Sequence, residues 1–355
     1  MQASSKQAAV LAPLERLSPQ DPRWRRFAGE HPDALGYHQP GWMAAIEACY
    51  GFPGFVLAAV DDDGAIEAGL PVMEVRLLRR RPRWASLPFT DQCPPLLGPN
   101  VSLDRFTAAL DAARITAGLG ELAVRAPLAE GGNAHFTMNA VLHTTALGGD
   151  PDQLFGRLHK SQVQRNIKRG QRDGAIVVRG EGAAALVDTY YALHVRTRKR
   201  HGMPVQPRRF FQALWDHVLE PGGGSVVLAY DGERPVAGAV LIHGPETVTY
   251  KYGASEDGAW RLRPNHLVLW EALRSACEQG YRLFDFGRSD LDGAGLREFK
   301  SGWAAKERPL IATTLAAHAP QDGSGRGLAA VQAVLRRSPA WAGRAAGELL
   351  YRFTA

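Results

Sequence analysis

The sequence has few of the features that mark secreted, membrane-spanning or cysteine-dependent proteins. Of its 355 residues only three are cysteine, Cys49, Cys93 and Cys277, too few and too scattered for a disulfide framework or a cysteine-based zinc site. No apolar run reaches the ~18 residues of a membrane-spanning helix. The opening residues, MQASSKQAAVLAPLERL, lack the basic patch and apolar core of a secretory signal. We therefore expect a cytoplasmic protein.

Several motifs of catalytic chemistry are also missing. The 11 histidines show no HExxH or HxxxH spacing, which argues against a zinc hydrolase. There is no GxSxG nucleophile turn, no GxxxxGK phosphate loop, and no GxGxxG after a predicted strand. These absences remove the usual support for metal-dependent, nucleotide-hydrolysing and dinucleotide-binding enzymes, and we predict no metal site.

What the sequence does have is ordinary globular composition and one strongly basic segment. Hydrophobic residues make up 45% and charged residues 22% of the chain, which is typical of a folded protein of about two domains. Residues 157–209 contain 13 Lys and Arg but 3 acidic residues, whereas the net charge of the whole chain is +6. This concentration predicts an anionic partner at one site: a phosphate group, a nucleic acid or an anionic lipid surface. A solvated basic face is the alternative for any single side chain.

The order of predicted elements repeats once along the chain. FVLAAVDDDGAIEAGLPV and SVVLAYDGERPVAGAVLI each read as two strands joined by an Asp-Gly turn, and each follows a pair of predicted helices. We therefore predict a mixed α/β (α+β) fold built from two copies of one unit. The first domain spans 1–149 and the second 150–320. Residues 321–355 form a C-terminal amphipathic helical region, which either packs on its own domain or lies on a membrane surface.

Two local expectations belong to the second unit. PDQLFGRLHKSQVQRNIKRGQRDG reads as one basic helix that ends at Gly174, and YKYGAS reads as a strand. Because side chains alternate along a strand, Tyr250 and Tyr252 are expected on the same face.

Six segments of the second half occur in a specific order with close spacing. They are HKSQVQRNIKRGQRDG, YYALHVRTRKRHGMPVQPRRFF, YKYGAS, RPNHLVLWEAL, YRLFDFGRSD and GLREFKSGWAAKERPL. In combination this order resembles the Fem family of aminoacyl and peptidyl transferases (FemAB and FemX), and in particular its shorter relatives associated with PEP-CTERM and exopolysaccharide gene clusters. The resemblance covers about Leu35 to Leu315 and implies two tandem GNAT acyltransferase folds. The coiled-coil arm of many Fem proteins has no counterpart here.

The segment REFKSGW carries the candidate catalytic pair, Phe299 and Lys300. The resemblance implies that Lys300 lies beside the carbonyl on which negative charge develops during acyl transfer. A partly desolvated ammonium is well suited to stabilise that oxyanion. The alternative is a surface lysine beside a core phenylalanine. No residue stands out as a general base.

Basic side chains form two candidate binding sites. Thr197 and Arg200 lie in a TxxRxG pattern that the resemblance assigns to the acceptor site, where the planar guanidinium would bind two oxygens of a diphosphate. A second group recurs at helical spacing on one face and consists of Arg165, Lys168, Arg169 and Arg172. This stripe would hold a charged tRNA, a phosphorylated lipid-linked acceptor or a membrane surface; the alternative is a solvated face. No helix-turn-helix context accompanies it, so we expect no DNA binding.

Three further residues are candidates for substrate contact. An ordinary GNAT domain has a glycine-rich loop that cradles pyrophosphate at a helix N-terminus. EDGAWRLRPNH lacks that pattern, but an anion can still be bound at the start of the following predicted helix. The candidate residue at that position is Asn265. Tyr252 either contacts the acceptor or is a packed strand tyrosine. The resemblance to the Fem family places Asp91, in LPFTDQC, in a first-domain substrate loop. Asp285 is expected to be structural, bonding Arg288 or the backbone.

These observations predict an acyltransferase that moves an aminoacyl or other acyl group onto an amine of a cell-envelope precursor, in peptidoglycan or exopolysaccharide. No bound cofactor is expected; the donor would be an aminoacyl-tRNA or an acyl-CoA. The partners would be a phosphorylated or lipid-linked amine acceptor, charged tRNA and, peripherally, the inner face of the membrane. One alternative is a CoA-dependent N-acyltransferase acting on a sugar amine. The other is a non-catalytic RNA- or membrane-binding protein that uses the basic helix.

Overall fold

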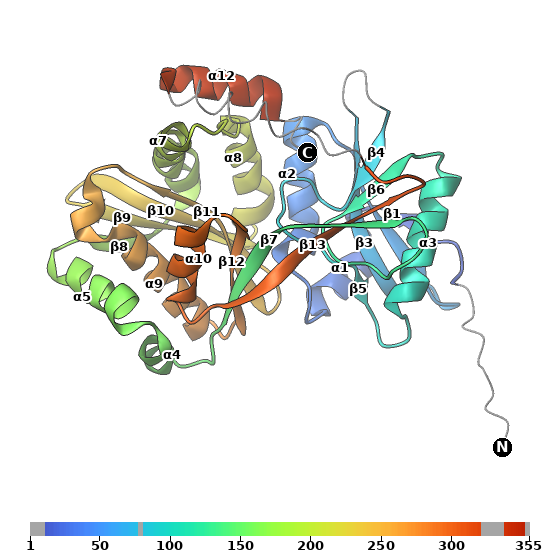
Figure 1. The fold of residues 1–355 in the computed structure, drawn as a ribbon, viewed down its shortest axis with the longest axis horizontal. Helices are drawn as coiled ribbons and strands as arrows, with labels where there is room; N and C mark the ends of the chain where they lie inside the picture. The colour runs from blue at the N-terminus through green and yellow to red at the C-terminus, as the bar shows by residue number, and fades with distance from the viewer. Residues whose placement is uncertain (1–10, 77–80, 321–336, 352–355) are drawn as a thin grey trace.

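The computed structural model describes residues 11–76, 81–320 and 337–351 (Figure 1). The opening residues 1–10, which belong to the segment searched for a secretory signal, and residues 321–336 of the predicted C-terminal region lie outside this description. No helix in the described parts is long and apolar enough to cross a membrane.

The first half of the chain contributes seven strands. They are β1 (Glu15–Leu17), β2 (Gly54–Val60), β3 (Ile66–Val75), β4 (Arg83–Ala85), β5 (Leu96–Leu97), β6 (Glu121–Val124) and β7 (Ala134–Ala146). Its helices are α1 (Pro22–Glu30), the 3-10 turn η1 (Gly36–His38), α2 (Pro40–Tyr50) and α3 (Leu103–Thr116). The predicted β2–β3 hairpin is present. Its turn is closed by the Asp61 carboxylate, which accepts a hydrogen bond from the Ala65 amide at 2.8 Å.

The second half contributes six strands and most of the helices. The strands are β8 (Ile176–Gly180), β9 (Gly224–Asp231), β10 (Arg234–His243), β11 (Thr247–Ser255), β12 (Leu283–Asp290) and β13 (Lys306–Ala316). The helices that precede β8 along the chain are α4 (Pro151–Arg157), η2 (Lys160–Gln164) and α5 (Arg165–Arg172). Those that follow it are α6 (Gly182–Ala184), η3 (Ala185–Tyr190) and α7 (Tyr191–His201). The others are α8 (Arg208–Leu214), η4 (Trp215–Leu219), η5 (Ala259–Leu262), α9 (Pro264–Glu278), α10 (Ala294–Ser301) and α12 (Ala340–Leu350).

All these strands join one sheet in which the two halves interlock. Its order is β1-β2-β3-β4-β6-β13-β7-β12-β11-β10-β9-β8, with β5 paired to β3. The last strand of the second half, β13, therefore lies between two strands of the first half, and β7 of the first half pairs with β12. Each half also contains one parallel pair, β4 with β6 and β11 with β12. This repetition of strands is what the internal echo in the sequence predicted.

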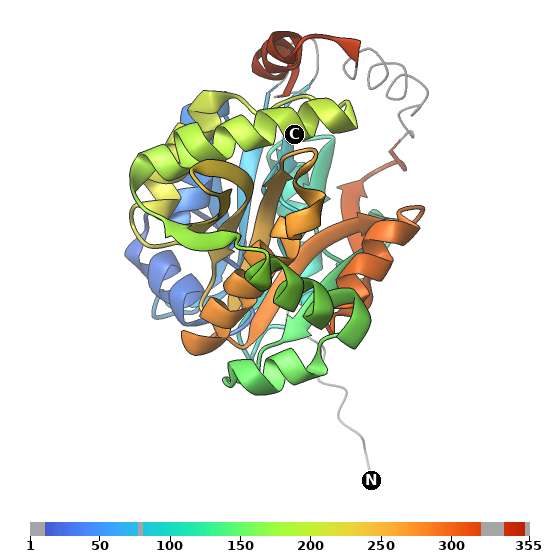
Figure 2. The same ribbon diagram turned by 90° about the vertical axis from the view of Figure 1, so that its left-hand side faces the viewer.

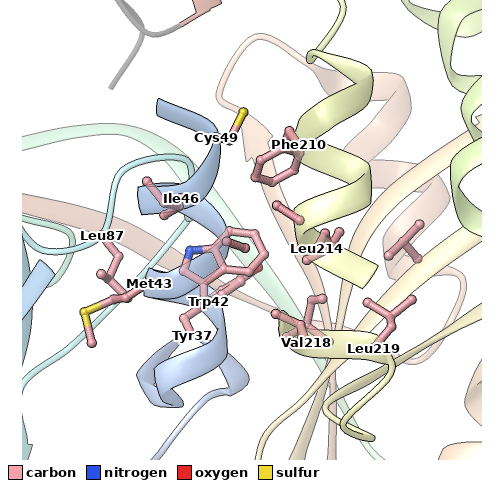
Figure 3. Packing of buried hydrophobic residues seen from close by; sticks show 14 of the residues in the cluster. Tyr37, Trp42, Met43, Ile46, Cys49, Leu87, Phe210, Leu214, Val218 and Leu219 are labelled. Atoms are coloured by element: carbon pink, nitrogen blue, oxygen red, sulfur yellow. The ribbon is translucent and has the colours of Figure 1, made fainter. Parts of the chain in front are cut away.

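Helices cover both faces of the second-half strands (Figure 1 and Figure 2). Alternate residues of β10 enter different cores: Val240 and Ile242 join the cluster that includes α7 and α8, while Ala239 and Leu241 join the cluster that includes α5 and α9. The first of these clusters also ties the halves together, because α2 packs against α8 through residues such as Trp42 (Figure 3).

The C-terminal helix α12 packs on the second half. The Val205 amide donates to the Gly343 carbonyl at 3.3 Å, and Arg209 pairs with Glu348 at 3.1 Å. Of the two alternatives for this region, the described part adopts the packed one.

Two local predictions were wrong. The basic segment is not one helix: α4 ends at Arg157, the chain extends at Leu158, and the His159 amide bonds the Gly302 carbonyl at 2.9 Å before η2 and α5 begin. Tyr250 and Tyr252 do not share a face. Tyr252 is opposite Val240 and Tyr250 is opposite Leu241, so Lys251 is an extra, bulged residue. A bulge adds one residue to the strand and reverses the expected alternation.

Candidate active site

The sheet of the second half splits between β11 and β12. These strands pair in parallel only over Thr247–Thr249 and Leu283–Asp285. Beyond that point each strand contacts residues 86–95 of the first half, which we call the bridging loop. Two strands that separate in the middle of a sheet leave backbone groups without strand partners that other groups can bind, so this split is a candidate active site.

Three hydrogen bonds join the bridging loop to the two strands of the split. The Lys251 ammonium donates to the Phe89 carbonyl at 2.5 Å, from β11. From β12, the Arg288 amide donates to Asp91 Oδ2 at 3.3 Å. The Gln92 side-chain amide donates to the Asp285 carboxylate at 2.9 Å. The bridging loop therefore contacts both strands of the split.

The backbone of the bridging loop is strained. Leu87 and Phe89 have φ angles of 45° and 65°, in the left-handed region that residues other than glycine rarely adopt. Each such residue costs about 1–3 kcal/mol and persists only where its surroundings hold it. Here the Thr90 hydroxyl donates to the Leu87 carbonyl at 2.7 Å. Strain of this kind is common at functional sites.

Lys300 lies beside this loop on α10, with only 5% of its surface exposed. Its Nζ donates to the carbonyls of Gly287 and Arg288 at 2.9 and 2.8 Å, which leaves one of the three ammonium hydrogens available. Burial lowers the pKa of Lys300 to about 8, although the charges of Asp91 and Asp285 oppose this effect. Lys300 is thus the desolvated ammonium expected from the sequence and not a surface lysine; its catalytic role stays a prediction.

Phe299, the other half of the predicted catalytic pair, faces α9. Its ring lies 5.4 Å from that of His266 and 6.1 Å from that of Trp303. These contacts fix α10 against its neighbours and thereby support Lys300. A direct part for Phe299 in catalysis stays a prediction.

Asp285 is a buried carboxylate that the sequence identified only as structural. It accepts hydrogen bonds from the Gly287 amide at 2.7 Å and from Gln92, and burial raises its pKa to about 6. Arg308 in turn donates to the Gln92 side-chain oxygen at 2.6 Å. The expected backbone bond is present, but Arg288 pairs with Asp290 instead. Gln92, which sequence reasoning missed, thus connects the two halves beneath the split.

Gly287 permits the close approach of the bridging loop. Its φ is 70°, and a Cβ at this position would lie 2.8 Å from Asp91 Oδ2. We predict that Gly287→Ala destabilises the fold by about 1 kcal/mol more than Gly222→Ala, since both change a residue with positive φ but only the first also meets a carboxylate. Urea unfolding measures both. Equal losses would contradict the seating of Asp91 against Gly287.

Three of the predicted substrate-binding residues converge on Ser255, at the end of β11. The Thr197 hydroxyl and an Arg200 guanidinium nitrogen donate to the Ser255 carbonyl at 3.1 and 3.0 Å. Asn265 lies 3.5 Å from the Ser255 hydroxyl. The guanidinium of Arg200 is exposed, so its remaining donors can bind an anion. Ser255 itself was missed, because serine in a strand carries no sequence signal.

The predicted basic stripe lines a cavity of about 660 Å³. Its lining includes Lys160, Arg165, Lys168, Arg169, Arg172, Asp173 and Arg263. Arg263, at the start of α9, comes from a different segment than the stripe, and Asn265 reaches Ser255 from the same helix turn. The basic cavity and the Ser255 cluster therefore meet at the N-terminus of α9, where helix geometry also favours an anion.

Comparison with known proteins gives the fold a name. Residues 157–301 match the family model "Acetyltransferase (GNAT) domain". The structure of FemX has a TM-score of 0.71 and 14% identity over 86% of this chain and 97% of that one. A tandem GNAT protein of the clavulanic acid pathway has a TM-score of 0.50 and 14% identity over 87% of this chain and 100% of that one. The chain has a tandem GNAT fold.

A third neighbour is the C-terminal domain (DUF2156) of an Agrobacterium fabrum protein described as a lysylphosphatidylglycerol synthetase. Its TM-score is 0.54 and its identity 16%, over 88% of this chain and 95% of that one. No curated protein sequence matches the chain. Identities this low establish the fold alone, and the predicted fold class is confirmed. The match to the GNAT family model also bears out the predicted enzyme class, an acyltransferase. The narrower placement among PEP-CTERM relatives stays a prediction.

Within this tandem GNAT fold, Tyr252 is packed among aromatic side chains. Its ring lies 5.7 Å from Phe211 and 5.9 Å from His194. This arrangement matches the packed alternative for Tyr252, and substrate contact stays a prediction. The residues that sequence reasoning missed, Gln92, Lys251 and Ser255, all act through contacts between distant segments.

Proposed function

We propose that this protein transfers an aminoacyl or other acyl group onto an amine at the split between β11 and β12. The observation that carries the proposal is the buried Lys300 ammonium, which two backbone carbonyls hold while one N–H stays available. The acceptor nitrogen attacks the donor carbonyl and a C–N bond forms. The resulting oxyanion is stabilised by Lys300. The C–O or C–S bond to the carrier then breaks, and the proton of the amine passes to solvent or to the leaving group.

The basic cavity is the proposed site for the phosphates of the donor. A charged tRNA is favoured, because the glycine pattern that cradles CoA pyrophosphate is missing from EDGAWRLRPNH. The fold likeness to FemX and to the lysylphosphatidylglycerol synthetase domain also supports an aminoacyl donor. Acyl-CoA is the second candidate, supported by the GNAT family match.

The Ser255 cluster is the proposed site for the acceptor. Arg200, fixed by Ser255, would bind a diphosphate through its free guanidinium hydrogens. We propose a phosphorylated or lipid-linked amine of a cell-envelope precursor, used at the inner face of the membrane, as the acceptor. The exopolysaccharide and peptidoglycan versions of this proposal differ only in the acceptor tested.

The test is mass-spectrometric detection of acyl transfer. Purified protein is offered charged tRNAs or acyl-CoAs together with nucleotide-linked and lipid-linked amines. A mass gain that requires charged tRNA supports the aminoacyltransferase, and a gain with acyl-CoA supports the N-acyltransferase. Tight RNA or vesicle binding without any gain across the panel, and with no change on Lys300→Ala, favours the non-catalytic binding protein.

The donor site gives a separate prediction. Replacing Lys168 and Arg169 with Gln should weaken tRNA binding and make the slope of log K against log salt shallower by about 1–2. The reason is that binding then neutralises fewer phosphates and so releases fewer counterions. Filter binding at several salt concentrations measures the slope. Lys199→Gln, an exposed charge on α7 outside the cavity, is the matched control. The same change in slope for the control would refute a specific phosphate site.

A further inference from the structure

Lys251 is a cation placed among aromatic rings. The bulge in β11 makes it the extra residue between Tyr250 and Tyr252. Its Nζ lies 5.3, 5.5 and 5.3 Å from the ring centroids of Tyr37, Trp42 and Tyr252, and its one hydrogen bond is to the Phe89 carbonyl. Tyr37 and Trp42 belong to the core between α2 and α8, as Figure 3 shows.

If the residue at this position only filled space in the core, an apolar side chain would be buried at a lower cost in free energy. Taking an ammonium out of water is costly unless a carboxylate pairs with it. In the described parts of the chain Lys251 forms no ion pair; ring faces and one carbonyl contact its ammonium, and the carboxylates of Asp91 and Asp285 favour its charge from a greater distance. A methionine or leucine would pack among the same rings without that cost. The ammonium therefore serves the group it bonds, which is the strained bridging loop.

The position of that bond matters for the split. Asp91 and Gln92 tie the bridging loop to β12, whereas Lys251 ties it to β11. Phe89, which accepts the Lys251 bond, is also one of the two left-handed residues of the loop. Without Lys251, nothing in the hydrogen bonds of the described residues joins the bridging loop to β11 across the split.

We propose that Lys251 is a positioning residue that anchors the bridging loop across the split and thereby keeps the Asp91 carboxylate against Gly287, next to Lys300. Its effect on catalysis rests on the proposed function, but the anchoring itself does not. The role is distinct from that of Lys300, since Lys251 acts through the Phe89 carbonyl and not on the reacting atoms.

Hydrogen exchange of the full chain tests the anchoring without any substrate. In Lys251→Met, which keeps the length of the side chain but removes its charge and donors, the amides of residues 86–95 should exchange roughly tenfold faster or more, since a charge-assisted hydrogen bond is lost. The helix α3, which lies outside the split, is the internal reference. Lys251→Arg should recover part of the protection, and Lys306→Met, an exposed lysine, should behave as wild type. Unchanged exchange over 86–95, or an equal rise in α3, would overturn the proposal.

Kinetics test the consequence for catalysis. With a donor and acceptor pair for which turnover is detected, Lys251→Met should lower kcat roughly tenfold, because misplacing groups beside the reacting atoms slows the chemical step. The KM for the donor should stay near the wild-type value, since the basic cavity lies on α5 and at the start of α9. Faster exchange over 86–95 with wild-type kcat would refute the link to catalysis. If neither the wild type nor any variant shows turnover, the proposed function fails. The exchange experiment still decides whether Lys251 anchors the bridging loop.

Discussion

Lys300→Met should lower kcat about 10²–10³-fold while the donor still binds, since removing one oxyanion donor typically has an effect of this size. Methionine keeps most of the side-chain volume but removes the charge and both hydrogen bonds to the Gly287 and Arg288 carbonyls. Single-turnover acyl transfer, followed by mass spectrometry, measures the rate of the chemical step. Donor binding is measured separately, because a loss confined to kcat indicates an interaction made in the transition state.

The comparison needs a variant that loses a lysine elsewhere. Lys306→Met removes an exposed lysine at the start of β13 and should keep wild-type kcat. Thermal unfolding of both variants shows whether Lys300→Met is folded at the assay temperature, because its two freed carbonyls cost about 1–3 kcal/mol each if they stay unpaired. A folded Lys300→Met with wild-type kcat would remove Lys300 from the reaction.

The parts of the site that depend on short segments could be predicted from the sequence. Arg165, Lys168 and Arg169 stand at positions i, i+3 and i+4, so helical periodicity alone places them on one face of α5. Thr197 and Arg200 are likewise three residues apart on α7, and both do reach Ser255. The repeated hairpins gave the fold class for the same reason, since an Asp-Gly turn between two apolar runs is a local signal.

The parts that depend on long-range contacts could not be predicted. The bond between Gln92 and Asp285 joins residues 193 positions apart, and no spacing rule connects them. The interleaving of β13 with β6 and β7 has the same character, because strand pairing is fixed by packing of the whole sheet. The bulge at Lys251 is one extra residue, yet it reverses the faces of Tyr250 and Tyr252. The Gln92–Asp285 bond and the bulge at Lys251 both lie at the split, so the candidate site is largely a product of tertiary structure.

The local environment of Lys300 also explains why its motif is informative. A lysine on a short helix beside an aromatic residue is common on protein surfaces. Here α10 packs through Phe299 on His266 and Trp303, which turns Lys300 toward the carbonyls of β12. The packing of Phe299 and the burial of Lys300 are therefore two consequences of the same helix orientation.

The activity of the wild-type protein should fall as the pH rises through about 8, the pKa of Lys300 in the folded state. Only the protonated ammonium stabilises an oxyanion, so the rate should drop about tenfold for each pH unit above that value. Lys300→Arg keeps a charge that is not lost in this range and should abolish the alkaline fall, at a lower maximal rate. The measurement is kcat between pH 6 and 10 for both proteins. An identical alkaline fall in Lys300→Arg would assign it to another group.

The free energy of unfolding should rise over the pH range in which activity falls, so the loss of activity can be distinguished from unfolding. Burial lowers the pKa of Lys300 from 10.5 in the unfolded chain to about 8 in the fold. Between these values the unfolded chain holds a proton that the fold has released, so raising the pH favours the fold. The contribution of Lys300 to stability therefore increases from pH 8 to 10.5 while the activity it supports decreases. Urea unfolding of wild type and Lys300→Met across this interval should show the difference, since the variant lacks this titration. A wild type that loses stability relative to Lys300→Met over the same interval would mean that Lys300 is held in its charged form, and the alkaline fall in activity would then have a different origin.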